Sequence, residues 1–299
     1  MNGSSRLGLI MALVGTLILA PDAMLMRLSE MDGFQMVGWR GLCMGTVMII
    51  GWALFTRDRG GDLRALGSRP GLGVILCQFL NSILFCLGIA LAPAAIVLLG
   101  IATVPVCAAV LGWVILGERT RTVTWLTIAA VMAGIFYAIS EEAGSGVVLD
   151  ATSALGAVLG LGVAVVLALN FVILRANPKV PIPLAIGCGA MTAGVVFSIV
   201  TGPEQMMDGK IWAMLLTGLV VLPVSFSLLS FASRYTVAAN VSLLMLLETV
   251  LGPLWVWVGV GEAPTTRMIT GGGFVVVVLA LYVSNQSRRR RPASRITGS

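Results

Sequence analysis

A stretch of 25 residues occurs twice in the sequence, as AAIVLLGIATVPVCAAVLGWVILGE at Ala94–Glu118 and as AANVSLLMLLETVLGPLWVWVGVGE at Ala238–Glu262. The two copies align at an offset of 144 residues without a gap, and 9 of the 25 positions are identical, including a Trp-Val pair and the final Gly-Glu. Each copy is apolar over more than the roughly 20 residues that a membrane-spanning helix needs. The sequence therefore predicts an internal repeat that contains a membrane helix.

The composition is that of a membrane protein. Of the 299 residues, 58% are hydrophobic and 11% are charged, and the mean hydropathy is +1.01. Soluble domains carry about 25% charged residues, so most of this chain's surface cannot face water. A soluble globular domain, a disordered chain and a coiled coil are therefore excluded.

Apolar runs recur along the whole chain with short breaks, and we expect each to form one transmembrane helix of an all-α protein. The ten runs are Leu7–Met26, Phe34–Phe55, Gly71–Leu91, Ala94–Leu116, Val123–Ile139, Ala154–Leu174, Ile182–Val200, Ile211–Phe231, Val237–Val258 and Met268–Val283. The first is expected to be a retained helix and not a signal peptide, because Pro21 and Asp22 stand where a small-residue cleavage site would end.

Lysines and arginines indicate the orientation in the membrane. With ten alternating helices, 15 of the 19 lie on the side of the N-terminus and 3 on the other side, with Arg40 inside a helix. By the positive-inside rule, both termini are cytoplasmic. Arg288–Arg291 directly follow the last helix, where each arginine gains about 1 kcal/mol from anionic headgroups. We interpret residues 286–299 as a basic tail on the lipid bilayer, with no nucleic-acid partner.

The helix count determines how the two halves are related. Residues 1–145 and 146–285 hold five helices each, and because five is odd the second half is inverted relative to the first. The charge count agrees, since it places Glu118 inside and Glu262 outside. Inverted repeats are typical of secondary transporters, in which the substrate site lies near the bilayer midplane between the halves. The sequence thus predicts a central cavity and transport by alternating access.

The sequence lacks the residues that several kinds of chemistry require. The chain has no histidine, and its five cysteines lie in apolar runs without a C-x-x-C pair. It also lacks a P-loop, a G-x-G-x-x-G and a G-x-S-x-G. We therefore expect no metal, no cofactor and no catalytic residues, which means no enzyme and no ATP-driven pump in this chain. The sequence sets no oligomeric state.

The two halves resemble the drug/metabolite transporter superfamily of the EamA type. The resemblance rests on the apolar run plus Gly-Glu that ends each repeated stretch, and it covers about Arg6–Ser284. Within this superfamily the chain is most similar to bacterial exporters of aromatic amino acids. The resemblance implies a small-molecule substrate, a bacterial inner (cell) membrane and helices arranged around a central cavity. One departure is that Glu248 is followed by Thr249, whereas the family often has Glu-Pro, and the proline here is Pro253.

Three ionisable residues lie inside apolar runs, where such groups are costly and point to function. They are Asp22, Arg40 and Glu248. In the functional interpretation Arg40 holds a substrate carboxylate or pairs with a carboxylate that takes up protons. In the structural interpretation the cluster is a static buried ion pair.

Polar and aromatic residues in the third run share one helical face. Their spacing of i, i+3, i+4 and i+7 suits a zwitterion with an apolar side chain. The 144-residue offset and a polar-aromatic pair in the sixth run add further candidates, although such groups also serve to join helices. The predicted substrate-binding residues are Gln78, Asn81, Ser82, Phe85, Asn170, Phe171, Ser225 and Phe226.

Two prolines inside helices, Pro105 and Pro253, are predicted gating hinges, with plain packing kinks as the alternative. The function predicted from the sequence is export of aromatic or neutral amino acids from the cytoplasm. Export of another small metabolite or a drug is the alternative within the same superfamily. A passive channel and an intramembrane enzyme are the alternatives from other classes.

Overall fold

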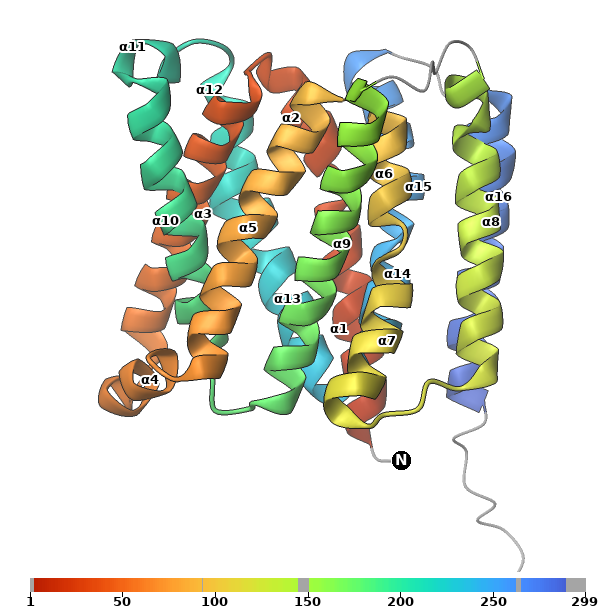
Figure 1. The fold of residues 1–299 in the computed structure, drawn as a ribbon, viewed down its shortest axis with the longest axis horizontal. Coiled ribbons are helices and arrows are strands. Elements are labelled where there is room, and N and C mark those ends of the chain that lie inside the picture. Colours follow the sequence, from red (N-terminus) through yellow and green to blue (C-terminus); the bar gives the residue numbers. More distant parts are fainter. Residues whose placement is uncertain (1–2, 93, 145–150, 262–264, 289–299) are drawn as a thin grey trace, which may run out of the picture.

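The protein is an all-helical bundle (Figure 1). The computed structural model describes residues 3–92, 94–144, 151–261 and 265–288. In chain order the helices are α1 (Gly3–Leu19), α2 (Asp22–Ser29), α3 (Gly33–Phe55), α4 (Arg59–Leu66), α5 (Arg69–Leu91), α6 (Ala94–Ile101), α7 (Val104–Leu116), α8 (Thr122–Gly144), α9 (Ala151–Ala176), α10 (Ile182–Thr201), α11 (Pro203–Met206), α12 (Ile211–Leu216), the π-helical η1 (Thr217–Val221), α13 (Leu222–Tyr235), α14 (Ala238–Met245), α15 (Leu247–Val260) and α16 (Thr266–Arg288).

Nine helical segments of the described chain are long and apolar enough to cross a membrane. They correspond to nine of the ten helices expected from the sequence. The remaining one is α8, which is apolar over the shorter segment Thr122–Ala138. The expectation of an all-α membrane protein is therefore confirmed, with nine to ten spans. We call the end of the bundle at which α1 begins the near end, and the end at which α2 finishes the far end.

Prolines account for interruptions within three spans. Pro21 separates α1 from α2, and Pro105 lies in the first turn of α7, directly after the break from α6. Pro223 is the second residue of α13, which begins where the π-helical η1 ends. A proline lacks the backbone N–H of a regular helix and clashes with the preceding turn, so a break or a π-helical turn in front of it is expected.

The span that holds the second copy of the repeat is broken at Leu246, between α14 and α15, while Pro253 lies inside α15. Ala102, in the break between α6 and α7, precedes Leu246 by 144 residues. The two copies therefore break at equivalent positions. Their ends are equivalent as well, because Gly117 and Gly261 terminate α7 and α15 with φ of 66° and 82°. Glycine adopts this left-handed conformation without steric cost, which explains the glycine of the Gly-Glu pairs. Glu262 itself lies outside the described residues.

Helix pairs that are distant in sequence hold the bundle together. α3 packs along α10, α5 along α9, α1 along α13 and α8 along α16. At the crossing of α3 and α10 the backbones touch, because a Cβ on Gly41 would lie 2.5 Å from the carbonyl oxygen of Ala190. Small residues allow such contacts in membranes, where van der Waals packing drives helix association. The centre of the bundle is α9, whose Leu167, Phe171 and Leu174 are fully buried.

The contact between α3 and α10 generates a stability prediction. Gly41→Ala is expected to lower the free energy of unfolding by about 1–3 kcal/mol, because the added methyl group forces two backbones apart. Thermal unfolding of the purified protein in detergent measures the effect. Gly51→Ala is the matched control on α3, since a Cβ there meets no atom within 4 Å. Equal stability of the two variants would contradict the close packing.

Candidate functional site

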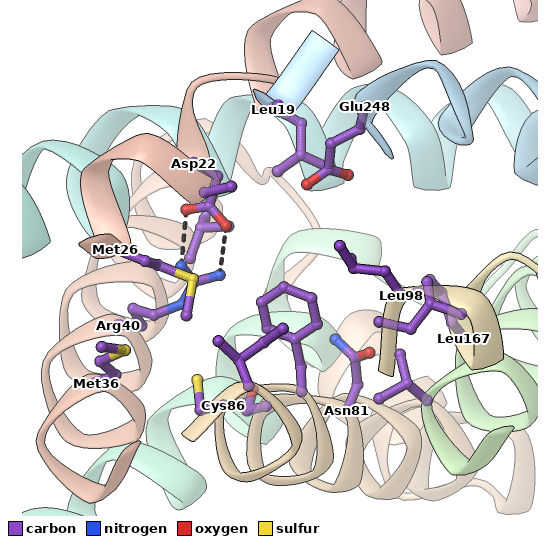
Figure 2. A pocket seen from close by; sticks show the side chains of 18 of the residues that line it. Leu19, Asp22, Met26, Met36, Arg40, Asn81, Cys86, Leu98, Leu167 and Glu248 are labelled. Atoms are coloured by element: carbon purple, nitrogen blue, oxygen red, sulfur yellow. Dashed lines mark hydrogen bonds and ion pairs between the residues drawn. The ribbon is translucent and has the colours of Figure 1, made fainter. Parts of the chain in front are cut away.

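A cavity of about 300 Å³ lies inside the bundle (Figure 2). The parts of the helices that line it place the cavity between the middle of the bundle and the far end. Its wall is built from α2, the first half of α3, the second half of α5, α6, the middle of α9, the start of α13, and parts of α14, α15 and α16. Nearly all of the membrane-spanning segments thus contribute to one space. The breaks between α1 and α2, α6 and α7, and α14 and α15 all lie beside it.

The polar face predicted on α5 is turned toward the cavity. Gln78, Asn81, Ser82 and Phe85 all line it. Ser82 Oγ donates a hydrogen bond to the backbone carbonyl of Gln78 at 3.0 Å, and Gln78 Nε2 donates to Ser82 Oγ at 3.4 Å. Gln78 Oε1 is buried and accepts no hydrogen bond from the residues that the structure describes. This face therefore offers the cavity an unused acceptor, an amide and an aromatic ring.

Asp22 and Arg40 form a bidentate ion pair in the wall of the cavity. Asp22 is the first residue of α2, and Arg40 reaches it from α3 with Nη1–Oδ1 and Nη2–Oδ2 distances of 2.7 and 2.9 Å (Figure 2). The Asp22 side chain is 2% exposed and that of Arg40 is 11% exposed. The guanidinium group also lies over the ring of Phe85, 5.6 Å from its centroid. Arg40 is thus held on one side by a carboxylate and on the other by an aromatic face.

Glu248, on the first turn of α15, lines the same cavity but forms no hydrogen bond or ion pair with Asp22 or Arg40. Within the described part of the chain it has no hydrogen bond and no ion pair. Its side chain is partly exposed, and its carboxylate points into the open space (Figure 2). The three ionisable residues therefore share one cavity, yet Arg40 pairs with Asp22 and not with Glu248.

The remaining predicted residues divide into two groups. Phe226 lines the cavity. Ser225, Asn170 and Phe171 do not line it and are at most 1% exposed. Ser225 Oγ donates to the carbonyl of Val221, a bond within its own helix region, whereas Asn170 and Phe171 face the packed side of α9. Neighbouring residues of a helix point about 100° apart, so one member of an adjacent pair can line a cavity while the other packs away from it.

Methionines in the lining were not singled out by the sequence. Met26, Met36, Met44, Met245 and Met268 come from four different helices, with Met36 and Met44 both on α3. No periodic pattern links them, because each helix contributes a different part of its length. Their flexible, polarisable side chains adapt to ligands of varied shape.

The near end of the bundle is packed and holds none of the cavity's lining. There Arg175, in the last turn of α9, binds the carboxylate of Glu118 with Nε and Nη2 at 2.6–2.9 Å. Its Nη1 also donates to the backbone carbonyls of Ser233 and Thr236, at 3.3 and 2.8 Å, where α13 meets α14. One guanidinium group thereby joins three spans. Glu118 belongs to the first Gly-Glu pair, which gives that residue a structural role.

The first half of the chain resembles a known transporter family. Residues 6–140 match the model of the EamA-like transporter family. This part of the chain is similar to EamA-like transporters. No curated protein matches the sequence. Of the 26 chains of solved structures that match, one, titled only as a crystal structure of a protein, has a TM-score of 0.76 and 19% identity, and the match covers 96% of this chain and 99% of that chain. At this identity the likeness concerns the fold alone.

The chain is accordingly a multi-pass membrane protein whose first half is similar to EamA-like transporters. The expectation that it is not an enzyme agrees with this match to a transporter family. The cavity is surrounded by side chains from most of the membrane spans that the structure describes.

The ion pair in the cavity wall generates a second stability prediction. Arg40→Met is expected to lower the free energy of unfolding by about 3–5 kcal/mol, because it leaves the buried carboxylate of Asp22 without its partner. The double variant Asp22→Leu/Arg40→Met is expected to regain most of this loss, since neither charge remains. Thermal unfolding in detergent measures both.

The matched control is the exposed pair of Lys210 and Glu30. Lys210→Met is expected to change the unfolding free energy by less than about 1 kcal/mol, because water screens that pair. If Arg40→Met cost no more than Lys210→Met, the pair in the wall would not stabilise the fold.

Proposed function

We propose that this protein is an EamA-like transporter that exports aromatic or neutral amino acids from the cytoplasm by alternating access. The observation that carries the proposal is the cavity of about 300 Å³, which combines hydrogen-bonding groups, an ion pair and aromatic rings. Its volume is at the small end of ligand pockets, which measure about 300–1,000 Å³. A ligand with a charged head and an apolar side chain matches this lining better than a purely apolar one.

Alternating access is supported by the difference between the two ends of the bundle. The cavity extends from the middle toward the far end, while the near end is closed by packed helices and by Arg175. A transporter of this kind must exchange which end is closed. Opening the near end requires Arg175 to release Glu118 and the two carbonyl groups. A passive channel fits less well, because a channel needs a path through the near end.

Inverted repeats are part of this proposal. The halves are residues 1–145 and 146–285, followed by the basic tail 286–299. Three observations support them: the equivalent breaks at Ala102 and Leu246, the equivalent left-handed glycines Gly117 and Gly261, and the opposite directions of α7 and α15, which end at the near and the far end (Figure 1). Such halves can exchange their conformations, which turns an outward-open state into an inward-open one.

Export of another small metabolite or a drug is the second candidate. The five methionines of the lining favour it, because they allow one cavity to accept ligands of different shape. A substrate panel separates the two candidates, since an amino acid exporter exchanges amino acids in preference to apolar drugs.

Transport is tested by counterflow in proteoliposomes with radiolabelled phenylalanine and a panel of other amino acids and drugs. We expect exchange of aromatic and neutral amino acids. Asn81→Leu and Ser82→Leu are each expected to reduce the apparent affinity about tenfold, which corresponds to about 1.4 kcal/mol for a lost polar contact. Leu76→Ala is the control on α5, because Leu76 is exposed on the surface of the bundle and not in the lining. Unchanged exchange in both polar-face variants would remove this face from the site.

The orientation in a bacterial inner membrane, with cytoplasmic termini, is tested by cysteine labelling in intact cells. Arg64→Cys lies on exposed α4 at the near end, and Asp208→Cys lies in the exposed connection between α11 and α12 at the far end. We expect a membrane-impermeant maleimide to label Asp208→Cys in intact cells and Arg64→Cys only after permeabilisation. Labelling of both from outside would refute the proposed orientation.

A further inference from the structure

The charges around the cavity do not balance locally. Arg40 and Asp22 neutralise each other through two hydrogen bonds. Glu248 has no hydrogen bond or ion pair to any residue whose side chain the structure describes. A carboxylate within a membrane span is costly unless a cation accompanies it. The cavity therefore contains one negative group for which the described protein supplies no paired cation.

Arg27 is the other cation of the lining, and its position separates it from Glu248. Ala23 of α2 and Gly252 of α15 are neighbours, since a Cβ on Gly252 would lie 3.8 Å from the Ala23 Cβ. Both helices lead toward the far end. Arg27 follows Ala23 by four residues, whereas Glu248 precedes Gly252 by four residues. At 1.5 Å per residue their backbones lie about 12 Å apart along the helix axes. Arg27 is exposed at the mouth, and Glu248 lies deeper.

The surroundings of Glu248 within the cavity are apolar or carry neutral polar groups. Leu19 and Leu98 flank the space into which its carboxylate points (Figure 2). Asn81 lies across that space, and the buried Gln78 Oε1 in the same wall has no donor. An ammonium group carries three N–H donors and one positive charge. It supplies the positive charge that this part of the wall lacks.

The carboxylate group of an amino acid would have Arg40 as its partner in the cavity. Arg40 has five N–H donors, and Asp22 occupies two of them. A substrate carboxylate can accept from the others, but Asp22 has already compensated the positive charge of the guanidinium group. The carboxylate therefore gains hydrogen bonds without meeting an excess of positive charge.

We propose that the cavity selects its substrate by a protonated amine, which binds the carboxylate of Glu248, while the methionines and Phe85 contact an apolar body. A carboxylate on the substrate is accepted but not required. The proposal rests on transport through this cavity, but it does not require that the substrate be an amino acid.

Three probes that share one phenyl ring test the proposal: phenylalanine, phenethylamine, which lacks the carboxylate, and 3-phenylpropionate, which lacks the amine. Each is offered as a competitor and as a counterflow substrate to the wild-type protein in proteoliposomes. We expect phenylalanine and phenethylamine to exchange, with apparent affinities within about tenfold of each other. The apparent affinity for 3-phenylpropionate is expected to be at least tenfold lower.

Glu248→Gln keeps the shape of the side chain and removes its charge. This variant is expected to bind phenethylamine at least tenfold more weakly than the wild-type protein does. The affinity is measured by the ligand-dependent thermal shift of the purified protein in detergent. Glu30→Gln is the control, because Glu30 is exposed and outside the lining. If Glu248→Gln does not fold, Glu248→Asp replaces it in the test. This variant retains the charge but withdraws it by one methylene, so the affinity for phenethylamine is expected to fall by a smaller factor.

The outcomes separate the two proposals. Exchange of phenethylamine without phenylalanine would overturn amino acid export and leave the selection for an amine standing. Exchange of phenylalanine and 3-phenylpropionate without phenethylamine would overturn the selection for an amine and leave amino acid export standing. Failure of all three probes would overturn both. Wild-type affinity for phenethylamine in Glu248→Gln would exclude Glu248 as the binding group.

Discussion

The bidentate pair of Arg40 and Asp22 determines what the cavity can offer a ligand. It crosses from α3 to the start of α2, directly behind the break at Pro21. If Arg40 instead paired with Glu248, Asp22 would be the uncompensated group, and the negative charge would lie on the other side of the space. The choice of partner therefore sets the place of the negative charge that a substrate meets.

The broken helices have a common consequence. A membrane helix normally satisfies all of its backbone groups internally, and interruptions are tolerated only where protein or a cavity surrounds them. In this bundle three breaks, at Pro21, at Ala102 and at Leu246, lie in spans that line the cavity. The backbone groups freed at these breaks are therefore surrounded by protein or face the cavity.

The near end of the bundle is closed by polar contacts of one arginine. At the near end, one guanidinium group holds α7, α9 and the junction of α13 with α14 through a carboxylate and two carbonyl oxygens. These contacts are polar and only partly buried, so water can replace them at modest cost. Separating an apolar interface of the same area would cost more free energy. Arg175 thus gives the near end a closure that is specific in geometry but reversible.

Much of the architecture could be read from the sequence, because a membrane helix is a local property of about 20 apolar residues. The all-α class, the positions of the spans, the repeat at an offset of 144 residues and the shared face of Gln78, Asn81 and Ser82 all depend on composition or on spacing within one helix. These features need no knowledge of which helices touch.

Only the tertiary structure decided which residues meet. Asp22, Arg40 and Glu248 are equally unusual in the sequence, yet two of them pair and the third is left without a partner. Asn170 and Phe171 have the same polar-aromatic pattern as residues that line the cavity, but α9 turns them into its packed interior. In the sequence Arg175 is one of many cytoplasmic charges, and only the structure shows that it binds Glu118 and two backbone carbonyl groups. The physical reason is that ion pairing and exposure depend on how the helices are rotated and how they cross, which packing determines and local spacing does not.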